Sequence, residues 1–556
     1  MTVPSDIKIA QAAKLRPITE VAEELGVSQV DLRPYGHHIA KVMPSAWESR
    51  EATAPLVLVT AMSPTAAGEG KSTVSVGLAQ ALRRLGRKPM LCLREPSLGP
   101  VFGIKGGAAG GGYSQVVPMD EINLHFTGDF HAITTAHSLL AAALDNNLHR
   151  GNSLGLDARR ITWKRTVDMN DRSLRSMVVG LGGPLGGLPR EDGFMITAAS
   201  EIMAIFCLAT DLADLQRRLA AVVLGRRPDF SMVEASALNV QGAQTLLLKD
   251  AIAPNLVQTL EGGPAFVHGG PFANIAHGCN SLIATSAALR LGDIVVTEAG
   301  FGSELGAEKF FDIKCRVGGL KPAAAVVVAT IRSLKMQGGV PKNDLAKPDA
   351  EAVCAGFPNL HHHIENVKQF GVPVIVAINR FATDTDEEVN AVVDMCRDIG
   401  ATAVPATIWA DGGAGGEELA EKLLDVLENE PSNFEPVYRL EESLENKLET
   451  IATKVYGADG VELEGKARKE AQRLEEAGYG SLPVCVAKTQ YSLTDDPTRL
   501  GRPKDFKITV RELRLSAGAG FVVALTGDVM TMPGLPARPA AEGMKILRDG
   551  TIQGLF

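Results

Sequence analysis

Thr60-Ala-Met-Ser-Pro-Thr-Ala-Ala-Gly-Glu-Gly-Lys-Ser-Thr73 is the stretch of sequence that decides the fold. Residues 55–60 form a short, β-branched apolar run, which is typical of a buried strand. Residues 74–85 behind the turn carry apolar side chains at helical spacing. A strand, a glycine-rich turn, a Lys-Ser pair and a helix in this order predict a phosphate-binding loop. We therefore expect the chain to bind a nucleotide, with an ordinary glycine-rich turn as the alternative.

The residue types in this loop suit a triphosphate. Small residues let backbone N–H groups approach phosphate oxygens closely, and the N-terminus of the following helix adds unpaired N–H groups and a positive dipole end. Lys71 is expected to reach the β- and γ-phosphates, and the Ser72 hydroxyl to ligate Mg²⁺. Thr65 departs from the pattern G-x-x-x-x-G-K-[ST], because it stands where the first glycine is expected. The predicted ATP-binding set is Thr65, Ala66, Ala67, Gly68, Glu69, Gly70, Lys71 and Ser72.

The composition is that of an ordinary soluble protein. Of 556 residues, 45% are hydrophobic and 22% are charged, which is enough to bury large cores. The formal net charge is −9 and no basic run is present, so we expect no nucleic-acid partner. The seven cysteines include no CxxC pair, which predicts reduced thiols and no zinc site. Neither a secretory signal nor an apolar window of eighteen residues is present, so we expect a cytoplasmic protein without a membrane span.

Further apolar runs predict the remainder of a parallel sheet. Two of these runs, residues 293–298 and 323–330, have the continuous β-branched sequence of parallel strands buried on both faces. Residues 88–93 and 372–379 are also predicted to be strands. We therefore expect an α/β fold: a phosphate-loop NTPase-like, mostly parallel sheet with helices on both faces, plus an inserted α/β domain and a C-terminal α/β domain.

Changes in residue composition along the chain suggest where these domains begin and end. Residues 151–190 are polar and arginine-rich, and they close on a glycine cluster. Helices are expected near 199–221 and 240–250, and the texture of the nucleotide domain resumes near residue 266. The expected domains are 1–137 with 272–360 for nucleotide binding, 138–271 for the insertion, and 361–556 for the C-terminal part.

Charged residues follow two of the predicted strands. Arg94 directly follows the strand at 88–93, at the end of the strand where open α/β sheets bind ligands. Its planar guanidinium suits a carboxylate or a transferring phosphoryl group. A salt bridge to Glu95 or another acid is the alternative. Glu298 ends the strand at 293–298 and is a candidate to support magnesium. A helix-capping or salt-bridged glutamate is the equally open alternative.

Aromatic residues and a glycine run mark a second region. Phe381 and Trp409 each follow a strand end, so the two rings are candidates to clamp a flat heterocycle, although such a tryptophan also suits a core. Residues 103–113 include seven consecutive glycines and alanines. We interpret this run as a loop lying against a ligand, with a disordered linker as the alternative.

The histidines offer no convincing metal site. His361, His362 and His363 are adjacent, so their side chains point to different faces of a helix. His268 and His277 lie near glycine-rich turns without a visible Ser, Cys or Asp partner, so no general base is assigned. The general base of the reaction is therefore left open.

Taken together, these motifs resemble the formate–tetrahydrofolate ligase family over essentially the whole chain. The most family-specific stretch is the glycine run at 103–113, and residues 328–339 are a second. Residues 266–281 and 298–316 and the phosphate loop with its Thr65 also look like this family. One departure is Gln337, where the family pattern has His or Asn.

This resemblance implies an ATP- and Mg²⁺-dependent ligase that uses a monovalent cation, K⁺ or NH₄⁺, and forms a homotetramer. Formate would attack the γ-phosphate to give formyl phosphate, and N10 of tetrahydrofolate would then attack the formyl carbon, giving 10-formyltetrahydrofolate, ADP and phosphate. By resemblance, Arg94 holds formate and then formyl phosphate, with Thr73 and Phe301 in the same pocket. Phe381 and Trp409 match the positions on either side of the pterin ring.

Two other classes share the phosphate loop. Another ATP-dependent carboxylate-activating enzyme would have Lys71 but need not have the glycine run or the two aromatics. A nucleotide-dependent switch or partitioning ATPase would have the loop as well. Such switches are typically much shorter, and this chain lacks an aspartate-glycine switch segment after its second strand. Phosphate release that requires both formate and tetrahydrofolate separates the three.

Overall fold

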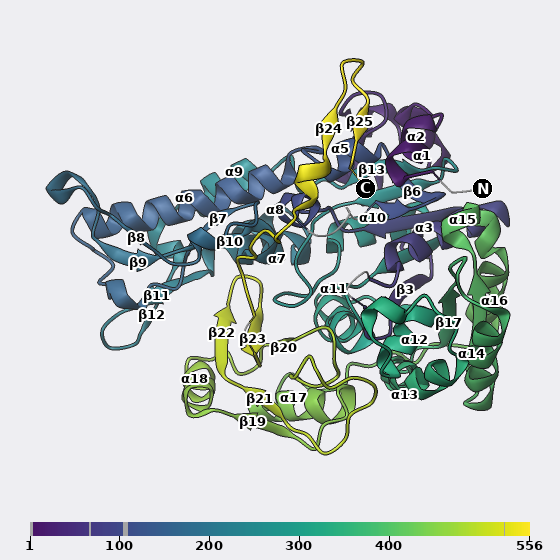
Figure 1. The fold of residues 1–556 in the computed structure, drawn as a ribbon. Helices are drawn as coiled ribbons and strands as arrows, with labels where there is room; N and C mark the ends of the chain where they lie inside the picture. Colours follow the sequence, from purple (N-terminus) through teal and green to yellow (C-terminus); the bar gives the residue numbers. More distant parts are fainter. Residues whose placement is uncertain (1–3, 66–67, 104–108, 528, 556) are drawn as a thin grey trace.

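A large, mostly parallel sheet forms the centre of the protein (Figure 1). The computed structural model describes residues 4–65, 68–103, 109–527 and 529–555. The strands from β14 to β18 in the order below are all parallel, and β13 joins them antiparallel at one side. The order is β1 (Leu32–Pro34), β2 (Ala40–Val42), β13 (Asn255–Thr259), β14 (Pro264–Val267), β4 (Pro89–Leu93), β15 (Ile294–Glu298), β3 (Leu56–Ala61), β16 (Pro322–Ala329), β17 (Val374–Asn379) and β18 (Thr402–Ala406).

The side chains of each central strand point alternately to the two faces of the sheet, which explains why helices cover both faces. In β3, Leu56 and Leu58 pack into one hydrophobic cluster, whereas Val57 and Val59 pack into another. Successive side chains of a strand point to opposite faces, so a fully apolar strand needs cover on both sides. One face packs against α10 (Leu282–Leu291), α13 (Ala350–Lys368) and α14 (Asp386–Asp398), and the other against α3 (Lys71–Arg84) and α16 (Glu417–Asn429). The predicted mostly parallel α/β sheet with helices on both faces is therefore confirmed.

The strand–loop–helix unit predicted from the opening stretch is present. β3 ends at Ala61 and α3 begins at Lys71, with Gly70 at its N-cap in the left-handed region (φ 70°). β4 follows α3 and lies two positions from β3, with β15 between them. The crossover places the ends of β4, β15 and β3 side by side.

Residues 129–248 extend away from the central sheet as an arm, on the left in Figure 1. The longest helix of this arm is α6 (Asp129–His149), which packs against α9 (Gln241–Leu248). The helix expected near 199–221 is divided in two, because Asp211 caps a new helix by accepting a hydrogen bond from the Asp214 N–H. The two helices are α7 (Glu201–Leu208) and α8 (Leu212–Ala220). The arm also contains three short strand pairs: β7 (Arg165–Val167) with β10 (Phe194–Ile196), β8 (Met177–Val179) with β9 (Arg190–Asp192), and β11 (Val223–Arg226) with β12 (Met232–Glu234).

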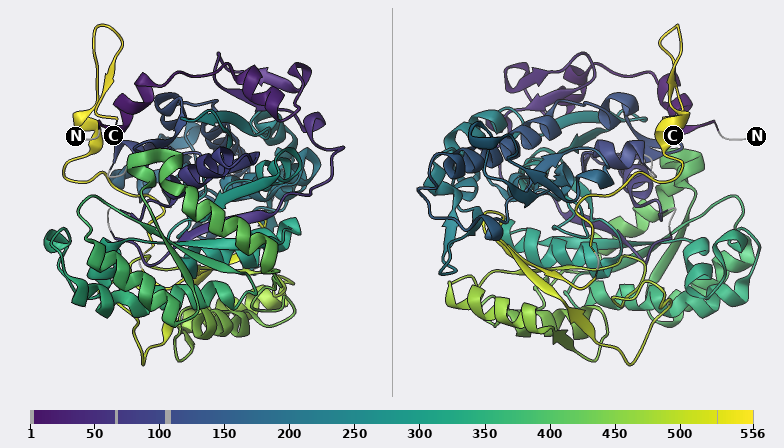
Figure 2. Two further views of the ribbon diagram at one scale, coloured as in Figure 1. Left: turned by 90° about the vertical axis from the view of Figure 1, so that its right-hand side faces the viewer. Right: turned by 60° about the vertical axis from the view of Figure 1, so that its left-hand side comes forward.

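Residues 438–525 pack around a third hydrophobic cluster below the sheet in Figure 1. Among the described residues, no helix is both long and apolar enough to cross a membrane. The last strands, β24 (Lys545–Ile546) and β25 (Ile552–Gln553), project as a hairpin in both views of Figure 2. The elements around the third cluster are α17 (Leu444–Thr450), β19 (Val461–Leu463), α18 (Gly465–Glu476), β20 (Val484–Ala487), β21 (Ile508–Val510), β22 (Glu512–Ser516) and β23 (Phe521–Leu525).

β17 and β18 bear on the predicted domain boundaries. Both lie within residues 361–556, yet β17 pairs with β16 and β18 pairs with β17 in the central sheet. The third hydrophobic cluster begins only at Tyr438. The division into three domains stays a prediction, and the strand pairing favours a C-terminal unit that starts after β18.

Candidate active site

The carboxyl edge of the sheet gathers most of the predicted site residues. Arg94 follows β4, Glu298 ends β15, and the phosphate loop follows β3. Phe381 and Trp409 follow β17 and β18, at the same edge. Since the carboxyl ends of parallel strands share one edge, the strand order brings together residues that are more than 300 positions apart.

Hydrogen bonds to Glu69, which belongs to the phosphate loop, hold the loop in place. Glu69 is buried, and one of its carboxylate oxygens accepts a 2.6 Å hydrogen bond from the Thr65 N–H. Its other oxygen accepts from the Thr330 hydroxyl, which follows β16. Asn379, at the end of β17, donates a 3.2 Å hydrogen bond to the Glu69 carbonyl. A Cβ on Gly70 would lie 2.5 Å from the Asn379 amide nitrogen, so this position requires glycine. Ala66 and Ala67 lie outside the described residues.

The two predicted magnesium-site residues are in direct contact. Ser72 Oγ donates a 2.7 Å hydrogen bond to Glu298 Oε2. Arg94 Nε lies 3.8 Å from Glu298 Oε1, so the alternative of a salt-bridged arginine is realised with Glu298 and not with Glu95. Within the described part of the chain, neither Arg94 Nε nor Glu298 Oε1 has a hydrogen-bond partner, although both atoms are buried. Arg94 and Glu298 thus each keep one buried polar atom without a hydrogen bond in the described residues, beside a phosphate loop, which suits a site for an anion and a cation.

Phe301 is held in an unusual backbone conformation. Its φ is 63°, in the left-handed region that bulky residues rarely adopt, and such strain clusters at ligand sites. Glycines flank it. A Cβ on Gly300 would lie 3.0 Å from a guanidinium nitrogen of Arg94, and a Cβ on Gly302 would lie 3.0 Å from the His363 ring. The segment therefore passes between Arg94 and His363 with no room for larger side chains.

The predicted folate residues are both half-buried. The guanidinium of Arg332 lies over the Phe381 ring, 4.4 Å from its centroid. Trp409 lies in α15 (Ile408–Asp411), and its carbonyl accepts a 2.9 Å hydrogen bond from the Tyr113 N–H. A Cβ on Gly111 would lie 3.5 Å from both Thr73 Oγ1 and the Trp409 ring. The end of the glycine run thus contacts two predicted site residues, while residues 104–108 lie outside the described residues.

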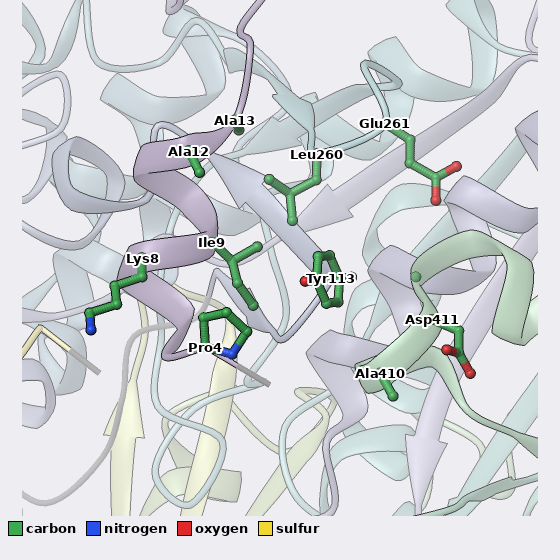
Figure 3. Close-up of a pocket in the computed structure, with 11 residues that line it drawn as sticks. Pro4, Lys8, Ile9, Ala12, Ala13, Tyr113, Leu260, Glu261, Ala410 and Asp411 are labelled. Atoms are coloured by element: carbon green, nitrogen blue, oxygen red, sulfur yellow. The ribbon is translucent and has the colours of Figure 1, made fainter. Parts of the chain in front are cut away.

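A pocket of about 500 Å³ opens on the outer side of α15 (Figure 3). It lies between α1 (Asp6–Ala12), the turn after β13 and the end of α15, and Tyr113 and Ile9 are among its apolar walls. Lys8 is the only basic residue among its described lining residues, and it lies on the opposite side of the pocket from the acids Glu261 and Asp411 (Figure 3). None of the described residues predicted to bind nucleotide, formate or folate lines it, although Ala410 and Asp411 directly follow Trp409.

Two buried histidines near the glycine-rich turns, His268 and His277, differ in their hydrogen bonding. His268 contacts Ser281 Oγ at 2.6 Å and the Ala251 carbonyl at 2.8 Å, and burial lowers its pKa to about 4. Neither ring nitrogen of His277 has a hydrogen-bond partner among the described residues. No group of three or more His, Cys, Asp or Glu within residues 4–65, 68–103, 109–527 and 529–555 is arranged to hold a metal ion. That the run 361–363 binds no metal stays a prediction.

One contact of this region was not predicted from the sequence. His363 lies against both the phosphate loop and the Phe301 segment through Ser63 and Ser303. In the sequence, only its place in a histidine run singled it out. Gln337, the residue that departs from the family pattern, accepts a 2.8 Å hydrogen bond from the Gly501 N–H and so supports a C-terminal loop.

Comparison with known proteins gives one consistent result. A model of the formate–tetrahydrofolate ligase family matches residues 4–556. A formate–tetrahydrofolate ligase from Symbiobacterium thermophilum is 59% identical over 555 residues, which covers 99% of this chain and 100% of that protein.

Proposed function

The chain belongs to the formate–tetrahydrofolate ligase family, and from this we propose that it joins formate to tetrahydrofolate in two steps driven by ATP. The ligation of formate and tetrahydrofolate follows from the family; the formyl phosphate intermediate and the residue roles are our proposal. The observation that carries it is a pair of buried charged atoms beside the phosphate loop, Arg94 Nε and Glu298 Oε1, which lie 3.8 Å apart and have no hydrogen-bond partner in the described residues.

In the first step, the phosphate loop binds the triphosphate of ATP. Backbone N–H groups of the loop and of the first turn of α3 face the phosphates, and Lys71 neutralises the β- and γ-phosphates. Ser72 and Glu298 would hold Mg²⁺, which supplies charge neutralisation at the γ-phosphate when bound. Their fit is supported by Glu298 Oε1, a buried carboxylate oxygen with no hydrogen-bond donor in the described residues.

Arg94 orients formate for attack on the γ-phosphorus. Its guanidinium can bind a carboxylate through two parallel hydrogen bonds, which fixes the attacking oxygen in line with the leaving group. A formate oxygen forms a bond to phosphorus, the bond to the β-phosphate oxygen breaks, and ADP leaves. Because the Phe301 segment lies beside Arg94 with no side chain at Gly300, it can cover the formyl phosphate formed there.

In the second step, N10 of tetrahydrofolate attacks the formyl carbon. The C–N bond forms, the carbon–oxygen bond to phosphate breaks, and the N10 proton is released, giving 10-formyltetrahydrofolate and phosphate. We propose that Phe381 and Trp409 lie on either side of the pterin ring, since both aromatic residues follow neighbouring strands at this edge. Thr73 lies beside Trp409 across Gly111, which supports a role in the same pocket. No residue is assigned as the base.

Some family properties have no assigned residues in this chain. A monovalent cation, K⁺ or NH₄⁺, is proposed from the resemblance alone, because no described cluster of His, Cys, Asp or Glu marks a site for it. A homotetramer and a cytoplasmic location are proposed on the same ground.

Isotope transfer tests the proposed route. With formate labelled by ¹⁸O, wild-type protein, ATP, Mg²⁺ and tetrahydrofolate should release phosphate carrying one ¹⁸O atom from formate. Unlabelled phosphate with a normal yield of product would contradict the formyl phosphate step and leave the ligation intact. Phosphate release without formate would indicate a switch ATPase, and release with formate but without tetrahydrofolate would indicate a different carboxylate-activating enzyme.

A further inference from the structure

His363 lies at the centre of a buried hydrogen-bond chain behind the phosphate loop. Its Nε2 is 3.0 Å from Ser63 Oγ, and its Nδ1 is 2.8 Å from Ser303 Oγ. Ser63 lies two residues before Thr65, at the start of the phosphate loop. Ser303 lies two residues after Phe301. One side chain therefore contacts both the nucleotide side and the formate side of the site.

Donors and acceptors in this chain allow one consistent arrangement. Asn359, one helical turn before His363 on α13, donates from Nδ2 to Ser63 Oγ at 3.1 Å. Ser63 Oγ can then donate its own proton to His363 Nε2, and His363 Nδ1–H donates to Ser303 Oγ. Ser303 in turn donates to the His363 carbonyl at 3.3 Å. Among the described residues, every hydroxyl and ring nitrogen of this hydrogen-bond chain has a partner when the imidazole is neutral with its proton on Nδ1.

The surroundings keep the ring neutral. His363 is fully buried, and burial holds its pKa well below the usual value, with Lys488 and Lys71 acting in the same direction. Glu304 Oε2 lies 3.5 Å from Nδ1, but burial raises the pKa of this carboxyl group, which weakens it as a counter-ion. The ring therefore acts as a fixed donor and acceptor and not as a proton carrier.

The Phe301 segment, one of the two parts that His363 contacts, has a strained backbone. Phe301 has a φ of 63°, and a backbone in this region persists only when its surroundings hold it. A Cβ on Gly302 would lie 3.0 Å from the His363 ring, so the backbone is in close contact with the imidazole. On the other side, Gly300 lies against Arg94. Loss of the Ser303 contact would release the segment on one side.

We infer that His363 is a positioning residue that sets the phosphate loop and the Phe301 segment relative to each other, so that bound ATP and formate meet in line. The inference rests on the proposed two-step function. It assigns separate tasks to the two ring nitrogens: Nε2 places the loop that binds ATP, and Nδ1 places the segment that covers formate.

Two substitutions separate these tasks. In His363→Asn the amide nitrogen can occupy the place of Nδ1, so the Ser303 contact is kept and the Ser63 contact is lost. In His363→Gln the amide can occupy the place of Nε2, so the Ser63 contact is kept and the Ser303 contact is lost. A lost neutral hydrogen bond changes affinity by about threefold to tenfold. His363→Asn should weaken Mg·ATP binding by this factor with little change in the KM for formate, and His363→Gln should do the reverse.

His362→Gln is the matched control. His362 is the neighbouring buried histidine on α13, and its Nε2 contacts the Val455 carbonyl at 2.9 Å. Its ring lies 6.1 Å from the His363 ring between centroids, so the substitution changes the immediate surroundings of His363 and keeps both serine contacts. This variant should leave the Mg·ATP affinity and the KM for formate within twofold of wild type. Two double-mutant cycles complete the test. Ser63→Ala is combined with His363→Asn, and Ser303→Ala is combined with His363→Gln. In each cycle we expect the effects of the two substitutions to be non-additive, because both remove the same contact.

The measurements are Mg·ATP binding by calorimetry, without turnover, and initial rates against formate. Equal effects of both substitutions on both ligands, or effects no larger than those of His362→Gln, would overturn the inference. A wild-type enzyme that binds Mg·ATP but transfers no ¹⁸O from formate would instead contradict the proposed route. In that case the ATP-binding difference between His363→Asn and His363→Gln still tests the role of Nε2.

Discussion

Ser72 Oγ donates a 2.7 Å hydrogen bond to Glu298 Oε2, which joins the first turn of α3 to the carboxyl end of β15. The serine belongs to the element that binds phosphate, and the glutamate belongs to the strand between β3 and β4. Glu298 is 2% exposed, so its charge is maintained by its neighbours and not by water. The pair is thus a fixed, acidic contact at the place where a triphosphate would bring its metal ion.

Replacing Glu298 by Gln should raise the Mg²⁺ concentration needed for half-maximal activity. The amide can still contact Ser72, but it removes the negative charge that orients the metal site. Loss of such an orienting group typically costs about 10- to 100-fold in metal affinity. Initial rates against Mg²⁺ at fixed ATP measure this, with Glu298→Asp as the variant that keeps the charge. An unchanged Mg²⁺ requirement in Glu298→Gln would remove this residue from the metal site.

Replacing Arg94 by Ala should lower turnover by about 100- to 1,000-fold, the usual effect of removing one preorganised group that stabilises developing charge. ATP binding should stay within a few-fold, because the phosphate loop does not depend on Arg94. Trapping of formyl phosphate with hydroxylamine and ATP calorimetry separate the two effects. Arg94→Lys keeps the charge beside Glu298 but loses the planar fork, so it should stay defective. Near-normal trapping in either variant would contradict the role of the guanidinium in binding formate.

Trp409→Ala should raise the KM for tetrahydrofolate with a modest change in the KM for ATP, because base–aromatic stacking contributes about 1–3 kcal/mol. Trp409→Phe, which keeps an aromatic ring, should recover part of the loss. Gly112→Ala offers an independent test, since its Cβ would lie 1.9 Å from the Trp409 carbonyl and the position has a φ of 58°. It should impair tetrahydrofolate binding without removing the ring. A normal tetrahydrofolate KM in both Trp409→Ala and Gly112→Ala would exclude the proposed pterin site.

The parallel sheet and its phosphate-loop unit were predictable because they are local patterns. The β-branched run before Thr60, the glycines and Lys71 follow one another in the chain, and each pattern has a direct physical meaning. Strand order is different. That β17 and β18 continue the sheet beyond β16 depends on which edge each strand joins, and apolar runs carry no such information. The boundary placed at residue 361 therefore fell in front of two strands of the central sheet.

The roles of single side chains were predictable only where the partner is close in sequence. Glu69 was assigned to ATP binding as part of the loop, but its carboxylate faces inward to Thr65 and Thr330. The sequence pattern around His363 suggests only a metal ligand, because its partners Ser63 and Ser303 lie 300 and 60 positions away. Contacts of this range depend on packing around α13, which the sequence pattern does not specify.

His137 should make the stability of the protein depend on pH. It is fully buried in α6, with Nε2 at 2.8 Å from the Lys164 carbonyl and Nδ1 at 2.7 Å from Ser200 Oγ, and its ring stacks on Trp163. Burial lowers its pKa from 6.5 to about 4. Between these values the unfolded chain binds a proton that the folded chain does not, so stability is full above pH 6.5 and falls as the pH drops towards 4.

The size of this effect can be isolated with His137→Gln. At pH 5.5, one unit below the unfolded pKa, the histidine costs about 1.4 kcal/mol of folding free energy that the glutamine does not. The stability advantage of wild type over the variant should therefore shrink by about this amount between pH 7.5 and pH 5.5. Urea unfolding at fixed protein concentration measures it, with the exposed His149→Gln on the same helix as the control. A difference between wild type and His137→Gln that stays constant across this range would show that the pKa of His137 is the same in the folded and the unfolded protein.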